Sequence, residues 1–567
     1  MTIFQSTRQP ISIPDIDIYS FLFSPNQFNR TRSPDRPLLI DGVTGKTLSF
    51  KQVRALTSKI ALGWKENIGL SKGDVVAVFA PNQYDHAVLY FSLLAAQCIV
   101  SPGNPSYTEG KYLKKHLLTH AFSSHIAEFS HQIQKSEAKA IVTIPALLPV
   151  LRKVAKKAKI PENRIFLFGN QTVGHALPFT LIASDHHSLI RLPIANMNPA
   201  EDLAFICFSS GTTGVAKGVM LTHRNFVSQI LTVSDFEGTD NNQEDDLLIG
   251  FLPFYHIFGL TTLVLRAFYS NTPVVVVPKY NLETVCRLIE KYRITIAPIV
   301  PPVAVQLAKN DVVLKYDLSS LRMITSGAAP LGIEHIEALH LRVKAPVRQG
   351  YGLTETTAGC MYQKIGKSPA GASGVLVANM ECKLVDQEGN EVGPDQPGEI
   401  LFRGPMVMKG YLNDDKANAE TFTKDDWMRT GDVAIYDSKS GEFYIIDRIK
   451  ELIKYKGYQV APAELEALLM SHKSVADCCV VGVYDPIQAT ELPRAYIVLQ
   501  PSVLDNQSTL KMMSEFVDGQ VVSYKRLRGG IRFIDQVPKS ASGKILRRQV
   551  REWVKKEQQQ EHERARI

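Results

Sequence analysis

The chain is poor in features that define several classes of protein. Its 567 residues include only seven cysteines and three tryptophans. The cysteines are scattered, form no CxxC pair and mostly sit in apolar stretches, so a zinc ribbon and a disulfide framework are both excluded. We therefore expect buried free thiols and a reducing compartment. The cysteines are Cys98, Cys207, Cys286, Cys360, Cys382, Cys478 and Cys479.

Strong charge and long hydrophobic runs are also lacking. Lysine and arginine total 64 against 56 acidic residues, a formal net charge of +8. This excess is partly local, at 153–159, 544–551 and 555–566, which suits solvated faces or anionic small ligands rather than nucleic acid. The longest apolar run, at about 87–100, is too short to span a bilayer. The first residues lack a basic start followed by an apolar core, so we expect no signal peptide.

Alternating strand and helix patterns fill most of the sequence. Helical patterns at 86–97, 145–159 and 282–292 separate short apolar strand patterns, an order that predicts parallel sheets with covering helices. From about residue 381 the strands become short and turn-bounded, as in a small β-rich subdomain. After Arg448 a last compact unit mixes helices and strands. The predicted strands of the first part are 74–80, 140–143, 164–168, 203–208, 272–278, 294–299 and 321–325.

A loop rich in glycine and hydroxyl groups follows the predicted strand at 203–208. Its glycines let backbone N–H groups approach a ligand, and its hydroxyls and lysine supply donors for phosphate oxygens. It is not the loop of nucleotide kinases, because Lys217 is followed by Gly218 rather than by serine or threonine. The sequence therefore predicts a phosphate-binding loop at Ser209, Ser210, Gly211, Thr212, Thr213, Gly214, Val215, Ala216 and Lys217.

This run resembles the signature of the adenylate-forming (AMP-binding) superfamily, which includes acyl-CoA synthetases, luciferases and peptide-synthetase adenylation domains. Val215-Ala216 departs mildly from the Leu-Pro that is usual there. Further segments resemble family motifs in the same order, and together they cover about 29–548. They are LPFYHIFGL at 252–260, TSGAAPLG at 325–332, QGYGLTET at 349–356, WMRTGD at 427–432, DRIKELIKYKGYQVAPAELE at 447–466 and PKSASGKILRR at 538–548.

The resemblance implies a site for ATP and Mg²⁺. Glu355 would hold the ion, which prefers carboxylate and phosphate oxygen, and Asp432 would accept the ribose hydroxyls. The other implied ATP or AMP contacts are Ser209, Ser210, Gly211, Thr212, Thr213, Gly214, Lys217, Gln349, Gly350, Tyr351, Gly352, Thr354, Arg448, Lys450, Lys454 and Gln459.

The resemblance also implies the sites for the acid and for coenzyme A. Lys544, His256 and Thr354 would be catalytic, with His256 beside the acid's carboxylate. The acid pocket would be formed by His256, Phe258, Thr262, Thr325 and Ala328, and CoA would contact Lys279, Lys456 and Gly457. The implied domains are a large N-terminal domain, 1–447, and a small mobile α+β domain, 448–567, that rotates about Asp447–Arg448.

The implied activity is that of an acid–CoA ligase of the 4-coumarate–CoA ligase-like branch. Such an enzyme activates a carboxylic acid as acyl-AMP and passes the acyl group to CoA. Ligases for hydroxycinnamates carry lysine just before SGAAPLG, where this chain has Thr325. We therefore expect a mainly apolar pocket for an aryl or medium-chain acid. A luciferase-like enzyme, a stand-alone carrier-protein-loading enzyme and a non-catalytic nucleotide sensor are the alternatives.

The last three residues, Ala565-Arg566-Ile567, resemble a variant of the Ser-Lys-Leu peroxisomal address. This predicts a peroxisomal location and an import receptor as partner, with the cytoplasm as the alternative.

Overall fold

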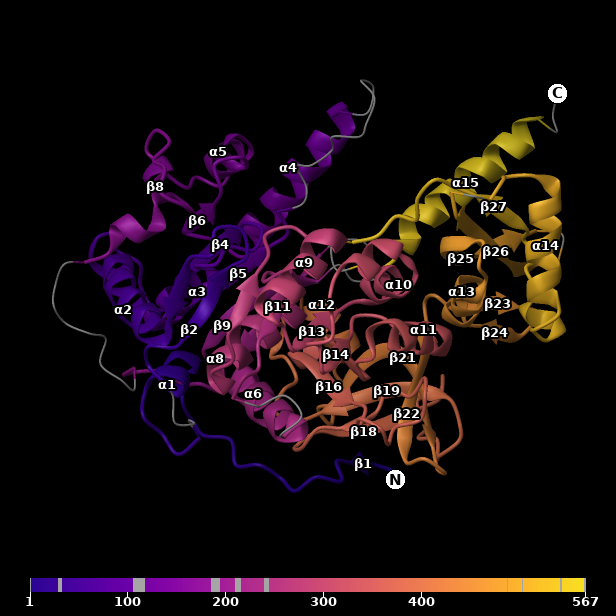
Figure 1. Cartoon of the computed structure of the whole chain (residues 1–567), viewed down its shortest axis with the longest axis horizontal. Coiled ribbons are helices and arrows are strands. Elements are labelled where there is room, and N and C mark those ends of the chain that lie inside the picture. Colours follow the sequence, from indigo (N-terminus) through magenta and orange to yellow (C-terminus); the bar gives the residue numbers. More distant parts are fainter. Residues whose placement is uncertain are drawn as a thin grey trace.

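The computed structural model describes residues 2–28, 33–105, 118–184, 194–209, 216–238, 244–486, 488–501, 503–540 and 543–564. A broad body contains the N-terminal and central parts of the chain, and the C-terminal residues form a smaller unit at one side of it (Figure 1).

The first large sheet has the strand order β20-β10-β9-β5-β4-β6-β7-β8. Neighbours from β9 to β8 run parallel, whereas β10 is antiparallel to both β9 and β20. The strands are β4 (Val75–Phe79), β5 (Ile99–Gly103), β6 (Ala140–Thr143), β7 (Ile165–Leu167), β8 (Leu177–Pro178), β9 (Leu203–Ser209), β10 (Lys217–Thr222) and β20 (Gly410–Tyr411).

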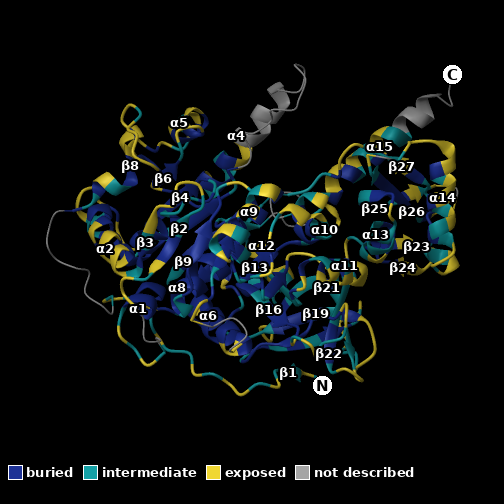
Figure 2. Ribbon diagram, in the orientation of Figure 1, coloured by how far each residue is buried: buried dark blue, intermediate teal, exposed yellow. Residues whose placement is uncertain are grey.

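Both faces of this sheet are covered, as the continuous apolar run in β4 requires. Alternate side chains of a strand point to opposite faces. Val76 and Val78 join the main core with α3 (His86–Ala95), whereas Val75 and Ala77 join a second core beneath α5 (Leu148–Lys157). Figure 2 shows the sheets as the buried centre of the body, with exposed residues gathered on the outer helices.

The second large sheet has the order β17-β16-β15-β14-β13-β11-β12-β2-β3. Its strands from β2 to β15 are parallel, and β3, β16 and β17 add antiparallel edges. Their bounds are β2 (Pro37–Asp41), β3 (Thr47–Ser49), β11 (Leu248–Gly250), β12 (Val274–Val276), β13 (Ile296–Ile299), β14 (Met323–Ser326), β15 (Val347–Leu353), β16 (Ala358–Tyr362) and β17 (Val375–Leu376).

The main core is shared by residues of both sheets and by the helices packed with them. The remaining helices of the body are α1 (Ile18–Phe23), α2 (Phe50–Glu66), α4 (Leu118–Lys135), α6 (His223–Glu237), α9 (Leu282–Tyr292), α10 (Pro301–Lys309), α11 (Ile333–Val343) and α12 (Asp415–Thr421).

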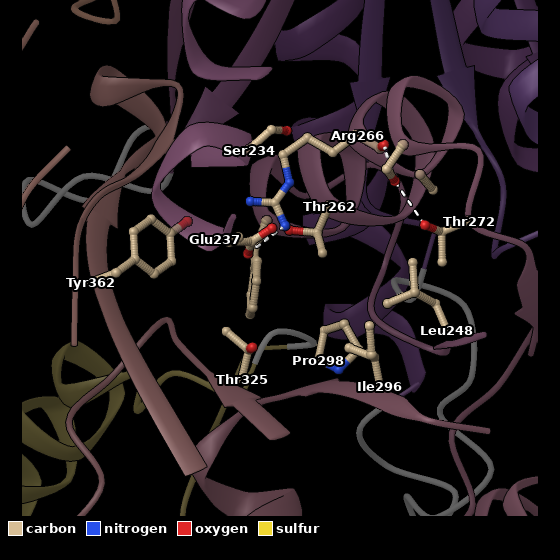
Figure 3. Close-up of a pocket in the computed structure, with 13 residues that line it drawn as sticks. Ser234, Glu237, Leu248, Thr262, Arg266, Thr272, Ile296, Pro298, Thr325 and Tyr362 are labelled. Carbon is tan, nitrogen blue, oxygen red and sulfur yellow. Dashed lines mark hydrogen bonds and ion pairs between the residues drawn. The ribbon is translucent and has the colours of Figure 1, made fainter. Parts of the chain in front are cut away.

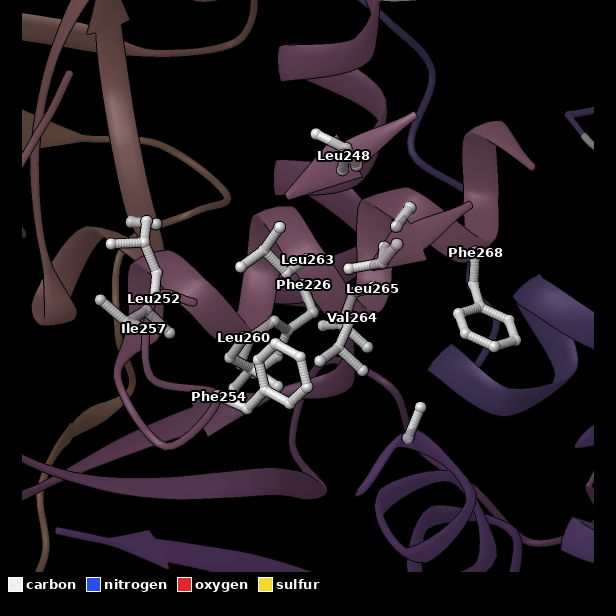
Figure 4. Close-up of a cluster of buried hydrophobic side chains, with 14 of the residues drawn as sticks. Phe226, Leu248, Leu252, Phe254, Ile257, Leu260, Leu263, Val264, Leu265 and Phe268 are labelled. Carbon is white, nitrogen blue, oxygen red and sulfur yellow. The ribbon is translucent and has the colours of Figure 1, made fainter. Parts of the chain in front are cut away.

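One buried helix is built from α7 (Ile257–Gly259), the π-helical segment η4 (Leu260–Arg266) and α8 (Ala267–Ser270). Its apolar side chains, among them Leu260 and Val264, gather with Phe226 and Phe254 in the main core (Figure 4). A π-helical turn is rare and often marks a functional site, and this one begins four residues after His256.

A five-stranded antiparallel sheet, β1-β18-β19-β21-β22, forms the predicted β-rich subdomain. Its strands are β1 (Phe4–Gln5), β18 (Glu381–Val385), β19 (Gly398–Arg403), β21 (Met428–Asp437) and β22 (Glu442–Arg448). The pairing of Phe4 with Cys382 ties the N-terminal segment to this sheet.

The C-terminal unit mixes strands and helices around apolar clusters of its own. Its strands are β23 (Ile453–Tyr455), β24 (Tyr458–Val460), β25 (Val475–Asp485), β26 (Thr490–Leu499) and β27 (Ile531–Phe533). Its helices are α13 (Pro462–Ser471), α14 (Gln507–Asp518) and α15 (Arg547–Arg564). The fold class predicted from the sequence is confirmed, while the boundary between residues 447 and 448 stays a prediction.

All seven cysteines are buried free thiols, as their apolar surroundings in the sequence indicated. Within the described ranges, no helix combines the length and the apolar character needed to cross a bilayer.

Candidate active site

The turn after β15 brings several predicted nucleotide contacts together. β15 carries Tyr351 and Gly352 and leads into the short helix η6 (Thr354–Thr356). A Cβ on Gly352 would lie 1.9 Å from the carbonyl oxygen of Ala358, so only glycine fits where β16 folds back. The Tyr351 hydroxyl donates a 2.6 Å hydrogen bond to Asp432, which joins this turn to β21.

Glu355, on η6, faces the two described ends of the phosphate loop. The hydroxyls of Ser209 and Tyr411 donate to the same carboxylate oxygen, Oε1, at 3.1 and 2.9 Å. The Nζ of Lys217 lies 4.7 Å from the ring centre of Tyr411. The loop therefore starts and ends beside Glu355. Its predicted contacts Ser210, Gly211, Thr212, Thr213 and Gly214 lie outside the described residues.

Asp432 is a buried carboxylate opposite Arg448. The two residues pair across β21 and β22, and the Nε of Arg448 lies 3.3 Å from Oδ1 of Asp432. Burial raises the pKa of Asp432, while Arg448 and the Tyr351 hydroxyl act in the other direction. An acceptor fixed at this depth suits the recognition of a sugar hydroxyl.

The loop that carries Lys544 is docked against the body of the molecule. Gly543 has a φ of +79°, and a Cβ there would meet the ring of Pro302, at the start of α10, at 3.1 Å. Burial, followed by the charge of Arg448, lowers the pKa of Lys544 to about 8, whereas Glu451, Asp432 and Glu355 act in the opposite sense. Charged groups from both parts of the chain thus act on this ammonium group.

His256 lies directly before α7. Its Nδ1 accepts a 3.3 Å hydrogen bond from the backbone N–H of Phe258 and caps α7. Burial, and secondarily the charge of Lys544, lowers the pKa of His256 to about 4. The ring is therefore neutral near pH 7, and because Nδ1 accepts, its proton lies on Nε2.

A pocket lies beside the buried helix, with Thr262 and Arg266 of that helix in its lining (Figure 3). Phe258, Thr262 and Thr325 line it, whereas the other two predicted pocket residues, His256 and Ala328, lie outside the lining, and Ala328 is exposed. The expectation of a mainly apolar pocket is wrong at the inner end, where charged and hydroxyl-bearing side chains gather. The full lining is Ser234, Glu237, Leu248, Phe258, Thr262, Arg266, Ala267, Ser270, Thr272, Ile296, Pro298, Thr325 and Tyr362.

Most of the other predicted contacts are exposed in this arrangement. Lys454, Lys456 and Gln459 are exposed on the β23–β24 hairpin, next to Gly457. Lys450 is exposed in the turn after β22, and Lys279 is exposed beyond β12. Of the residues before the turn, Gln349 uses its side chain to accept a 2.9 Å hydrogen bond from Leu331, and Gly350 leaves room for the ring of Tyr362.

A clamp of ion pairs links the segment after β22 to the Lys544 loop. Arg547 binds Glu451, at 2.7 Å, and Glu466 of α13. Asp447 accepts a 3.0 Å hydrogen bond from Ala463 at the start of the same helix. Burial raises the pKa of Glu466 to about 7, an effect that Arg547 opposes.

Some of these residues were not predicted from the sequence. Tyr411 had no motif around it, and its place beside Glu355 depends on the pairing of distant strands. Arg266, in contrast, is a lone charge in the apolar stretch 257–269. That signal could have indicated a buried arginine with a dedicated partner.

Comparisons with known proteins identify the family of this chain. The model of the family described as AMP-binding enzyme matches residues 27–412, and that of its C-terminal domain matches 464–544. A 4-coumarate–CoA ligase of Oryza sativa subsp. japonica is 37% identical over 560 residues, covering 97% of each chain. One from Pinus taeda is 37% identical over 557 residues, covering 95% of this chain and 96% of its own. An anthranilate CoA ligase solved with anthranoyl-AMP superposes with a TM-score of 0.81 at 22% identity, over 95% of this chain and 98% of its own.

Proposed function

Because this chain belongs to the family of AMP-binding enzymes and is an AMP-forming acid–CoA ligase, we propose that it activates an aryl or medium-chain acid. The observation that carries the proposal is the convergence of Lys544, His256, Glu355 and Asp432 from separate parts of the chain. These groups supply an ammonium, a neutral imidazole and two carboxylates at one place.

In the first half-reaction, a carboxylate oxygen of the acid attacks the α-phosphorus of ATP. The new P–O bond forms as the bond to pyrophosphate breaks, which leaves acyl-AMP. No general base is needed, because the nucleophile is already an anion. The Nε2–H of His256 binds the carboxylate. The ammonium group of Lys544 stabilises the negative charge that develops on the phosphate in the transition state. Thr354, beside Glu355, contacts the α-phosphate.

The residues present fit a magnesium ion at Glu355. Both of its hydroxyl donors bind Oε1, and within the described residues no donor reaches Oε2, which leaves a hard oxygen ligand for the ion. When bound, Mg²⁺ neutralises phosphate charge during the transfer. Ser209 and Tyr411 fix the carboxylate that would hold it.

In the second half-reaction, the CoA thiol attacks the acyl carbon and AMP leaves. The Lys544 loop covers the centre in the arrangement seen here, so the thiol needs another approach. We place the hinge at Asp447–Arg448. Rotation there would bring the exposed Lys456–Gly457 turn to the acyl-AMP. The further contacts proposed for CoA or nucleotide are Lys279, Lys450, Lys454 and Gln459.

The names of the relatives support an aryl acid as substrate. The curated relatives are called 4-coumarate–CoA ligases, and the solved neighbour holds anthranoyl-AMP. Phe258 supplies an aromatic wall to the pocket, and Gly327 lets its ring lie close to the backbone, since a Cβ there would meet that ring at 3.2 Å.

A panel of acids tests this function. The purified chain is given ATP, Mg²⁺, CoA and one acid at a time, and AMP and thioester are measured together. We expect equimolar AMP and thioester with aryl or medium-chain acids. Acid-dependent AMP without thioester, whatever the acid, would contradict the ligase assignment.

We also propose that the chain is peroxisomal and is bound by an import receptor. The support is the terminal Ala565-Arg566-Ile567, which lies outside the described residues. A fluorescent fusion should give a punctate pattern that becomes diffuse when these residues are deleted. An identical pattern with and without them would contradict the proposal.

A further inference from the structure

The pocket is lined in part by a buried cluster of two arginines and one glutamate. The carboxylate of Glu237, from α6, lies 2.6 Å from Arg348 of β15 and 3.1 Å from Arg266 of η4. The exposed fractions of these side chains are 6%, 0% and 9% respectively. Two guanidinium groups therefore share one carboxylate, and since arginine stays protonated in proteins, the cluster carries a net positive charge.

Several donors of the cluster have no acceptor. Both guanidinium groups bind the same oxygen, Oε1 of Glu237. The Nε and Nη1 atoms of Arg266 and of Arg348 are buried and find no hydrogen-bond partner among the described residues. An unsatisfied buried donor is costly, and more so when it is charged. The described part of the chain therefore supplies no acceptor for these donors.

The pocket shows where that acceptor would lie. Arg266, Glu237 and Tyr362 all line it, and Figure 3 shows the Tyr362 hydroxyl turned toward the Arg266 guanidinium with Glu237 beside it. The hydroxyls of Thr262 and Thr325 line the same space. The inner end is thus a place for a group that accepts hydrogen bonds, not for a terminal methyl.

The reactive end of the substrate lies at the other end of the same helix. His256 precedes this helix and Arg266 ends its π-helical segment, ten residues later. At the rise of a helix, and with side chains that lean toward its N-terminus, the two ends are roughly 10–15 Å apart. That span matches an acid with an aromatic ring or a chain of several carbons between its two polar ends.

We propose that the substrate is an acid with a second carboxylate at the end remote from the one that is activated. Arg266 binds this remote carboxylate and so balances the charge of the cluster. The inference rests on the proposed ligase function and specifies its substrate class.

The proposal of a dicarboxylic substrate is tested with matched acids on the whole protein. Each dicarboxylic acid is paired with the monocarboxylic acid of equal length, in an aryl series and in an aliphatic series. For each acid, kcat/KM is measured both by acid-dependent pyrophosphate release and by thioester formation. We expect the dicarboxylic acid to be favoured by about 10-fold or more. A preference for the monocarboxylic acid, or for a neutral hydroxyl or keto group at the remote end, would overturn the proposal.

The variant Arg266→Met removes the proposed contact. It leaves Arg348 and Glu237 as a balanced pair, so the remaining buried charges stay compensated. We expect kcat/KM to fall about 100-fold for the dicarboxylic acids, the scale of losing a buried charge-assisted contact, and to change less than about 3-fold for the matched monocarboxylic acids. An equal loss for both classes would contradict a role in recognition.

Controls separate this proposal from the ligase function itself. Arg287→Met removes an exposed arginine of α9 and should leave kcat/KM unchanged for both classes of acid. It controls for the loss of one positive charge from the protein. Activity of the Arg266→Met variant on monocarboxylic acids reports that it is folded. If the wild-type chain activates neither class, the ligase function fails; if it activates only monocarboxylic acids, the ligase function stands and the present inference fails.

Discussion

Lys544 lies in the candidate active site, and the pKa of its ammonium group is lower than usual. Burial and the nearby Arg448 lower its pKa to about 8, so in the free enzyme the charge is present below that pH and is lost above it. In the proposed mechanism the first half-reaction needs this charge, which gives adenylation a pH limit on the alkaline side.

We therefore predict that kcat/KM for acid-dependent pyrophosphate release falls as the pH rises through about 8, because this ratio reports the free enzyme. In kcat the fall should come at higher pH, since bound phosphates favour the ammonium form. The variant Lys544→Arg, which stays charged, should be slower but lose this fall. The same alkaline fall in that variant would show that another group is responsible.

Single residues were predictable from the sequence only where a motif marked them. Glu355, Asp432 and Lys544 were found because each stands in a segment with a family resemblance. Tyr411 and Glu237 were not, because their roles arise from contacts between elements that are distant in the chain. Thr325 was identified as a pocket residue, but the charge of its neighbour Arg348, 3.5 Å away, changes what the pocket is expected to bind.

At the scale of elements, the sequence was informative about local structure. The strands predicted at 74–80 and 140–143 are β4 and β6, and the helix predicted at 282–292 is α9. Alternating apolar runs and helical spacing indicate such elements directly. The π-helical turn at Leu260–Arg266 has no such signature, and neither has the pairing of β1 with β18, which joins residues almost 380 positions apart.

The clamp of Arg547 connects the proposed hinge, α13 and the Lys544 loop, and its removal should lower the stability of the protein. The variant Arg547→Met leaves Glu451 and Glu466 buried without their partner. Breaking a buried ion pair in this way costs about 3–5 kcal/mol of unfolding free energy, which chemical denaturation would measure on the C-terminal transition.

The neighbouring Arg548→Ala is the matched control for this prediction. Arg548 is exposed, and among the described residues it pairs only with Glu552 in the next turn, so its loss should change the unfolding free energy by less than about 1 kcal/mol. Equal effects of the two substitutions would mean that the clamp does not stabilise the C-terminal unit.

At the scale of the whole molecule, the arrangement depends on a close contact between the two parts of the chain. Gly543 lies against Pro302 and Val300 with a positive φ, and Lys309 donates a 3.0 Å hydrogen bond to the Met470 carbonyl. The sequence predicted that Lys544 could reach the centre, but not which residues of the body would receive its loop.

We predict that Gly543→Ala disturbs this docking, because a side chain is strained at that φ and also meets the proline ring. Pyrophosphate release should slow about 10-fold or more, whereas thioester formation from supplied acyl-AMP should change little. Gly519→Ala, where φ is −76° and the nearest atom to a new Cβ is 3.4 Å away, should affect neither. Equal slowing of both half-reactions by Gly543→Ala would contradict this docking role.

The central claim, that Lys544 serves the first half-reaction from the C-terminal part of the chain, is tested most directly by Lys544→Ala. Acid-dependent pyrophosphate release and thioester formation from supplied acyl-AMP are measured side by side. We predict a loss of about 100-fold or more in the first and little change in the second. Pyrophosphate release at nearly the wild-type rate would contradict the account.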